Sequence, residues 1–330
     1  MKIEKITDVT VNIDVVKPQP VVGLGNPAIF VSGLAKGCKV YRSLSALAED
    51  HASGTDVYAK AAAIFGQRNI PQKVHVITYE TSKVAEAASE YFYEEWHFAL
   101  LAKYEEVAAL ALSNLIEEQE YKFFVVQVAT ATELGPFAGN ESTIGLVHPL
   151  SEHLDAALIG DSANLPVGSI TWKFRSGLVG ITAQPLGVSE LEAIDAANGI
   201  AYISKAGVAQ TSEGTTLSGE FIDAVHGTHW VKANMESQIQ NVLTTSDKVD
   251  FDLNGIDLLN VTASNVLETA TQQGIVSRND EGKGNYAVAT LQKEQLDPGD
   301  VKNRVYKGLS FNYERSAAIH AAVVSGTIEV

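Results

Sequence analysis

Between residues 21 and 148, short apolar runs alternate with stretches that have the composition and spacing of helices. The apolar runs cover residues 28–31, 74–79, 96–101, 122–128 and 144–147. The predicted helices between them cover residues 43–51, 55–65, 84–93 and 104–118, and Ser43 and Thr55 are suitable N-caps. Strands that alternate with helices predict a mostly parallel sheet covered by helices, which is an α/β fold.

The second half of the chain has a different pattern. Residues 149–188 are rich in Gly and Pro and predict an irregular connection around one strand at 169–174. A short helix at 189–198, a two-stranded turn (200–204 and 208–211), long helices at 216–243 and 257–273, and strands at 286–291 and 305–313 are expected to follow. Gly227 is a candidate interruption of the first long helix. These elements predict a mixed α+β domain over residues 189–316.

Both ends of the chain have the pattern of extended β-arms. In the first segment, residues 1–20, four apolar residues alternate with polar ones: Val9, Val11, Ile13 and Val15. Pro18 and Pro20 then hold the chain extended, and no turn follows the strand. The strand must therefore pair with a distant part of its own sheet, as an ordinary edge strand, or with another molecule.

The last segment, residues 317–330, is β-prone, lacks Pro and has a single charge at Glu329. Residues 319–324 are expected to form the main strand, with interface positions at Ile319, Ala321, Val323 and Val324. Because an unpaired strand invites aggregation, donation to a neighbouring copy of the chain is the expected use.

Charge restricts the possible partners. The chain has 24 Lys and Arg against 40 Asp and Glu, a formal net charge of -16, which disfavours nucleic-acid binding. Residues 84–120 contain nine Glu and one Lys, either a solvated face or a contact surface for a basic partner. Residues 301–315 reverse the sign, and Lys302, Arg304 and Lys307 are predicted to face an acidic surface. No apolar run is long enough for membrane insertion, and the first residues lack an apolar leader, so we expect an unsecreted chain.

No catalytic constellation is recognisable. The Gly23–Gly25 pair precedes a strand, whereas a dinucleotide fingerprint follows one. His226 and His229 lie three residues apart on a predicted helix but have no third ligand nearby, so buried helix histidines are favoured. His148 and His153 flank a proline with Glu152 and Asp155 close by, where a metal site is conceivable but not favoured. The single cysteine, Cys38, has no adjacent histidine. We therefore expect no catalytic, cofactor-binding or metal site.

Several short motifs resemble contractile tail sheath proteins of bacteriophages, and they occur in the same order over nearly the whole chain. They are YRSL at 41–44, YAKAAAIF at 58–65, VHV at 74–76, GSITWKF at 168–174, GIT at 180–182, NGIAY at 198–202, GEFID at 219–223, HWV at 229–231, RVY at 304–306 and AAIH at 317–320. The chain is short for this family, which implies that the outer decorating domains of larger members are absent.

The resemblance implies a structural subunit, not an enzyme, that needs no cofactor. Such subunits stack as hexameric rings around a tail tube protein, and their terminal arms add strands to sheets of neighbouring copies. The resemblance further implies baseplate and tail terminator partners, assembly in the host cytoplasm, a place in the virion tail, and contraction that drives the tube through the host envelope for genome ejection. Two alternatives remain open: the sheath of a related bacteriocin or secretion device, and a soluble α/β enzyme with a pocket at the carboxyl edge of its sheet.

Overall fold

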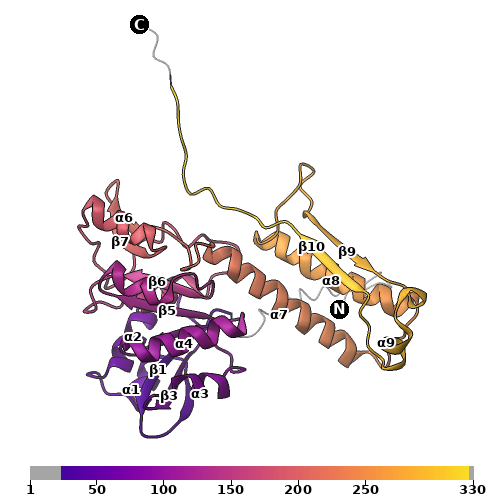
Figure 1. Cartoon of the computed structure of the whole chain (residues 1–330), viewed down its shortest axis with the longest axis horizontal. Helices are drawn as coiled ribbons and strands as arrows, with labels where there is room; N and C mark the ends of the chain where they lie inside the picture. The colour runs from indigo at the N-terminus through magenta and orange to yellow at the C-terminus, as the bar shows by residue number, and fades with distance from the viewer. Residues whose placement is uncertain (1–23, 327–330) are drawn as a thin grey trace, which may run out of the picture.

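The computed structural model describes residues 24–326 and contains one eight-stranded sheet in the order β2-β3-β1-β4-β5-β6-β7-β8 (Figure 1). The six inner strands are parallel, and the edge strands β2 and β8 pair antiparallel with their neighbours. The strands are β1 Pro27–Gly33, β2 Gly37–Tyr41, β3 Val74–Glu80, β4 Phe98–Leu101, β5 Phe123–Val128, β6 Thr143–Val147, β7 Ile200–Lys205 and β8 Val208–Thr211. The predicted mostly parallel α/β fold is confirmed.

Helices cover both faces of this sheet, which explains why its central strands are apolar on both sides; all six residues of β5 are buried. Helices α2 and α5 pack together on one face, and α3 and α4 on the other. The elements around the sheet are α1 Leu44–Ala48, α2 Asp56–Phe65, α3 Val84–Glu90, α4 Glu106–Gln119, η1 Ala131–Phe137, α5 Leu154–Ser162 and α6 Val188–Ala196. Ser43 and Thr55 cap α1 and α2 through their hydroxyl groups, as predicted.

A second group of elements, which we call the distal module, packs around two long helices. It consists of α8 Leu253–Gln273, the C-terminal half of α7 Ile222–Thr245, β9 Tyr286–Thr290, η2 Lys293–Gln295, α9 Pro298–Lys302 and β10 Leu309–Tyr313. Its core contains Trp230, Met235, Val266 and Leu267. The N-terminal half of α7 packs beneath the sheet, and Figure 1 shows the helix leading from there to the distal module.

Helix α7 continues through Gly227 without interruption. A Cβ atom at this position would lie 2.9 Å from Cγ2 of Ile275. The glycine therefore permits close packing between α7 and the segment after α8, at the junction of the sheet and the distal module.

Residues 149–190 differ most from expectation. The strand predicted at 169–174 is wrong: Gly168 and Phe174 have left-handed backbones (φ 85° and 67°), which end any extended run, and the Trp172 side chain is buried between them. Part of the expected irregular stretch is instead helix α5. All nine α5 residues are buried, so the helix has no polar face from which a helical period could be read.

The sheet also continues past residue 188, where the sequence suggests the start of a separate C-terminal domain. Strands β7 and β8 extend it from β6. Over residues 24–326, no helix is long and apolar enough to cross a membrane.

Candidate assembly site

The C-terminal arm, residues 317–326 in the described part of the chain, begins next to the end of α8. The Ser316 N–H donates to the carbonyl of Ile275 at 2.9 Å, and Arg315 forms a β-bridge with Val276. Arg315 also lies 3.5 Å from a Glu220 carboxylate oxygen. These contacts tie the root of the arm to the junction between the sheet and the distal module.

His320 makes the last side-chain contacts of the arm with the body. Its Nε2 lies 2.6 Å from Oγ1 of Thr171, and its ring meets the ring of Phe221 edge-on at 4.9 Å and that of Phe174 at 6.0 Å. We call this set of contacts the His320 clasp. Burial raises the pKa of the neighbouring Asp223, and the charge of His320 partly opposes that shift.

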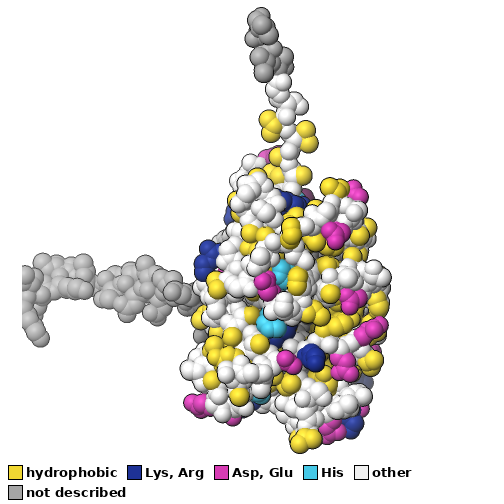
Figure 2. All heavy atoms as spheres, turned by 90° about the vertical axis from the view of Figure 1, so that its left-hand side faces the viewer, with side chains coloured by type: hydrophobic (Ala, Val, Ile, Leu, Met, Phe, Trp, Pro, Cys, Tyr) yellow, Lys and Arg dark blue, Asp and Glu magenta, His cyan; other side chains and the backbone are white. Residues whose placement is uncertain are grey.

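Beyond the clasp, the arm projects into solvent (Figures 1 and 2). Val323 is 96% exposed and Val324 92%, and Ala321 is exposed as well; Ile319, just before His320, is 82% exposed. Within residues 24–326, no backbone–backbone hydrogen bond involves residues 317–326. The structure therefore places these four sequence-predicted interface residues on an extended, unpaired and apolar segment.

The distal module contains a sheet of only two strands, β9 and β10. They are antiparallel, with Tyr286 opposite Tyr313 and Thr290 opposite Leu309. One side packs on α8, with Val288 among the contacting side chains. Neither strand has a second partner among the described residues, so both are edge strands.

The hydrogen-bond pattern shows which amides are free at these edges. The Leu291 N–H donates to Gly308 O at 3.0 Å, and the Glu314 N–H donates to Asn285 O at 2.9 Å. Because antiparallel pairs alternate between bonded and non-bonded, the backbone groups of Val288 and Phe311 point outward. An added strand would bond to these outward groups.

The basic segment begins at Lys302, the last residue of α9, and continues along the connection to β10. Lys302 and Arg304 are exposed, and Lys307 pairs with Asp300 at 2.8 Å, a hydrogen bond that raises the pKa of Lys307. The expected N-terminal strand (Val9, Val11, Ile13 and Val15) lies outside the described residues.

The histidine pairs noted in the sequence make ordinary protein contacts. His148 Nε2 lies 2.8 Å from Glu152 Oε2, and the pKa of Glu152 is lowered by the Thr182 backbone N–H and then by His148. His226 and His229 are buried beneath the sheet. In residues 24–326 no group of three His, Cys, Asp or Glu side chains is arranged to hold a metal ion.

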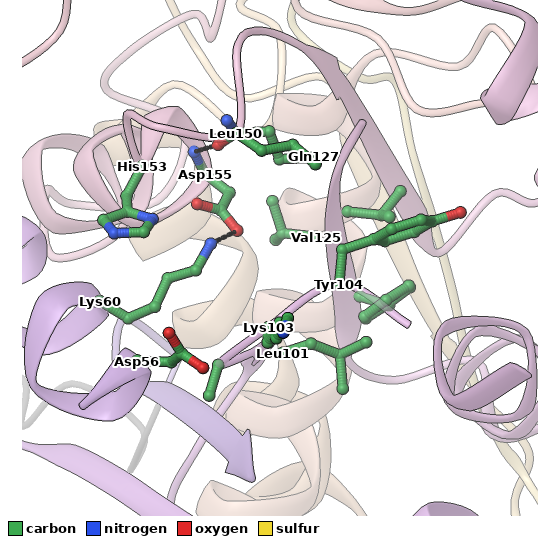
Figure 3. Close-up of a pocket in the computed structure, with 13 residues that line it drawn as sticks. Asp56, Lys60, Leu101, Lys103, Tyr104, Val125, Gln127, Leu150, His153 and Asp155 are labelled. Carbon is green, nitrogen blue, oxygen red and sulfur yellow. Dashed lines mark hydrogen bonds and ion pairs between the residues drawn. The ribbon is translucent and has the colours of Figure 1, made fainter. Parts of the chain in front are cut away.

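The carboxyl edge of the sheet does carry a cavity of about 230 Å³ beside β4, β5, α2 and α5 (Figure 3). Within it, the Lys60 ammonium and the Asp155 carboxylate point toward one another and form an ion pair, with side chains only 8% and 3% exposed. The second Asp155 oxygen accepts the Ala156 N–H at 2.7 Å, and the Asp155 N–H donates to Oε1 of Gln127 at 3.1 Å. No local sequence pattern indicates this pair, because its members are 95 residues apart.

The polar side chains at this cavity are joined to one another and to nearby backbone groups by hydrogen bonds. Gln127 Nε2 donates to the carbonyls of Glu152 and Pro149, at 2.7 and 3.1 Å. Burial first, and then the charge of Lys60, lower the pKa of His153 at the cavity rim. The network joins α2, β5 and the start of α5, and its contacts are those of a structural link.

No family model matches the sequence, and no curated protein matches it. Solved structures do. A chain of the anti-feeding prophage baseplate aligns with a TM-score of 0.70 at 10% identity, covering 99% of this chain and 100% of that one. A chain of the sheath complex of the PVC extracellular contractile injection system, in its contracted state, aligns with a TM-score of 0.70 at 9% identity, covering 100% and 99%. A sheath tail protein from Listeria innocua aligns with a TM-score of 0.60 at 8% identity, covering 88% and 95%.

The similarity therefore spans the eight-stranded sheet and the distal module together. At these identities it concerns the fold. The chain has the fold of contractile tail sheath proteins, in agreement with the resemblance of its sequence motifs.

Proposed function

We propose that the chain is the structural subunit of a contractile sheath, in which copies polymerise by exchanging terminal strands. The observation that carries this proposal is that one molecule has both an unpaired apolar arm and, among its described residues, a two-stranded sheet with two open edges. The fold shared with sheath proteins supports it independently. The copies would stack as hexameric rings around a tail tube and contract to drive it through a host envelope, in contact with baseplate and terminator proteins.

The arm is directed away from the acceptor sheet of its own chain. Ser316 is held at Ile275 and His320 at Thr171, and Figure 1 shows the arm running away from β9 and β10. Residues 321–326 are as long as either strand, so a neighbouring copy can be paired over a full strand length. Donor and acceptor lie on the same chain but are directed apart, so the arm would pair with a neighbouring copy. Such a head-to-tail contact gives an open polymer where the rotation between successive copies does not close a ring.

A mixing experiment tests strand exchange directly. A deletion of residues 321–330 removes the donor, and Val288→Pro or Phe311→Pro blocks one outer edge of the acceptor while leaving the β9–β10 hydrogen bonds intact. Each variant alone should stay small in sedimentation and negative-stain microscopy. When the arm deletion is mixed with the proline variant that blocks the accepting edge, the two should form 1:1 dimers without tubes. Each such pair has one intact donor arm and one intact acceptor edge.

The two proline variants also identify which edge accepts the arm, since only one of them should block that contact. Tubes formed by the arm deletion alone would contradict the proposal. The alternative of a soluble α/β enzyme makes a different prediction, since the wild-type chain would then sediment as a small closed oligomer and not as tubes or rings. The sheath type, whether phage tail, bacteriocin or secretion device, is tested by co-purification with a tube protein from a phage lysate or from a cell envelope fraction.

A further inference from the structure

Three buried histidines join α7 to the sheet. His97 lies just before β4, whereas His226 and His229 lie one turn apart on α7, and their residues are 1%, 3% and 5% exposed. His97 Nε2 lies 3.1 Å from Nδ1 of His229, and the rings of His97 and His226 stack at 5.2 Å. We call this set the histidine joint.

The surroundings of the joint are apolar or positively charged. The rings of Phe98, Phe123 and Trp172 pack against His226 with centroids 5.3 to 6.3 Å away. The two charged side chains that act on the imidazoles are both cations, Lys122 on His97 and Lys232 on His229.

Two further titratable groups lie at the border of the joint. The Tyr121 ring lies 5.7 Å from that of His229, and burial followed by the charge of Glu236 raises the pKa of its phenol. Burial lowers the pKa of Lys122 to about 7, and the charge of Glu94 partly opposes that shift. Neither carboxylate, Glu94 or Glu236, is among the charges that act on the three imidazoles.

The neutral imidazoles make hydrogen bonds that hold the joint closed. The His226 Nε2–H donates to the carbonyl of Leu24 at 2.9 Å, so the joint also fixes the first described residues of the chain. Burial lowers the pKa of His226 to about 4 and that of His229 to about 3, and it holds the pKa of His97 well below its usual range. At neutral pH all three side chains are uncharged.

We propose that the histidine joint is an acid-sensitive latch between the sheet and α7. Protonation would place positive charge in an apolar site that already faces two lysines, so the protonated joint must open. Since α7 leads into the distal module, opening releases that module from the sheet. The latch is a property of the single chain and does not depend on sheath assembly.

The direction and size of the effect follow from proton linkage. In the open form each imidazole regains an ordinary pKa of about 6.5, so below that pH the open form binds protons that the closed form does not. The closed form is fully stable above about pH 6.5 and loses stability as the pH falls toward 4 and 3, the pKa values of His226 and His229 in the closed form. Between pH 7 and pH 5 the opening equilibrium should rise about 20-fold for each of these two histidines, or about 500-fold together.

Hydrogen exchange on the full-length, unassembled chain tests the latch. With rates corrected for the intrinsic effect of pH, residues 222–235 should lose about 100-fold or more of their protection between pH 7 and pH 5. Residues 123–128 of β5 should keep theirs. In His226→Gln/His229→Gln the side-chain amide at position 226 can still donate to Leu24 O, and only His97 of the three can still take up a proton. Residues 222–235 should therefore lose far less protection at pH 5 than in the wild type.

His75→Gln is the matched control, because His75 is 1% exposed and burial lowers its pKa to about 4, but it lies on β3. In this variant α7 should lose hydrogen-exchange protection between pH 7 and pH 5 to the same extent as in the wild type. The proposal is wrong if the double variant loses as much α7 protection between pH 7 and pH 5 as the wild type.

If the double variant does not fold, an NMR pH titration of the histidine imidazoles in the wild type tests the latch instead. The three histidines should remain neutral while α7 is protected and should titrate only as it opens. Titration near pH 6.5 with unchanged α7 protection would overturn the latch.

Discussion

The Nε2 atom of His320 lies 2.6 Å from Oγ1 of Thr171, although the two residues are 149 positions apart. This contact marks where the C-terminal arm leaves the body. His320 is held by this contact, and residues 321–326 extend beyond it without backbone hydrogen bonds to the described part of the chain. Residues 319–324 form no strand within the single chain, so the strand expected there stays a prediction about the assembled state.

The first prediction concerns the His320 clasp. His320→Ala removes both the hydrogen bond to Thr171 and the ring contact with Phe221, so the arm loses its fixed direction and pairing with a neighbour costs more entropy. Since a net hydrogen bond contributes about 0.5–1.5 kcal/mol, the critical concentration for assembly, measured by sedimentation, should rise about 2- to 10-fold. Thr171→Ser keeps the hydroxyl and should assemble like the wild type. Equal critical concentrations for His320→Ala and wild type would show that the clasp has no role in assembly.

The second prediction concerns the arm itself. Val323→Pro removes a ladder donor in the middle of the segment and should abolish tubes. The circular dichroism spectrum of the chain should not change, because Val323 is 96% exposed in the single chain. Val323→Ala keeps the amide and should still polymerise. Tubes of Val323→Pro at wild-type concentrations would mean that this part of the arm is not paired.

The third prediction concerns the N-terminal arm, which remains an expectation from sequence alone. Deletion of residues 1–17 removes the alternating strand but leaves the linker prolines. The deletion should give a folded monomer that no longer forms tubes, as judged by negative-stain microscopy. Normal tubes would favour the reading in which this strand is a dispensable edge of its own domain.

The fourth prediction concerns the basic segment. Lys302→Glu/Arg304→Glu reverses two exposed cations that are predicted to face an acidic neighbour, so it should raise the critical concentration at 0.1 M salt. The defect should shrink at 1 M salt, because the Debye length falls from about 10 Å to about 3 Å. Lys283→Glu is the control, since that exposed lysine lies before β9 and pairs with Glu281. A defect that is equally large at both salt concentrations would indicate a steric cause.

The sequence predicts the parallel sheet well because strands such as β5 are buried on both faces and are therefore apolar throughout. The same principle explains the failure at α5, where complete burial removes the polar face that identifies a helix. The edge strand β2 was missed because it is short and is fixed by pairing with β3.

The candidate assembly site can likewise be predicted from the sequence only in part. The apolar, Pro-free arm is a local pattern and is visible in the sequence. The Thr171–His320 contact and the two-stranded acceptor sheet depend on segments that meet only in the folded chain, and no local signal identifies such meetings.

The last prediction concerns the buried Lys60–Asp155 ion pair at the carboxyl edge of the sheet. Lys60→Met leaves the buried Asp155 carboxylate without its counter-charge, and the free energy of unfolding should fall by about 3–5 kcal/mol, measured by urea denaturation. In Lys60→Met/Asp155→Leu no uncompensated charge remains, so much of that loss should be recovered. Because the proposed contacts between copies lie on the arm and on β9–β10, the double variant should still form tubes. If the double variant is as unstable as Lys60→Met, the attraction between Lys60 and Asp155 itself stabilises the chain. The loss in Lys60→Met would then not be due to the uncompensated Asp155 charge alone. A stable double variant that makes no tubes would place an assembly contact at this cavity.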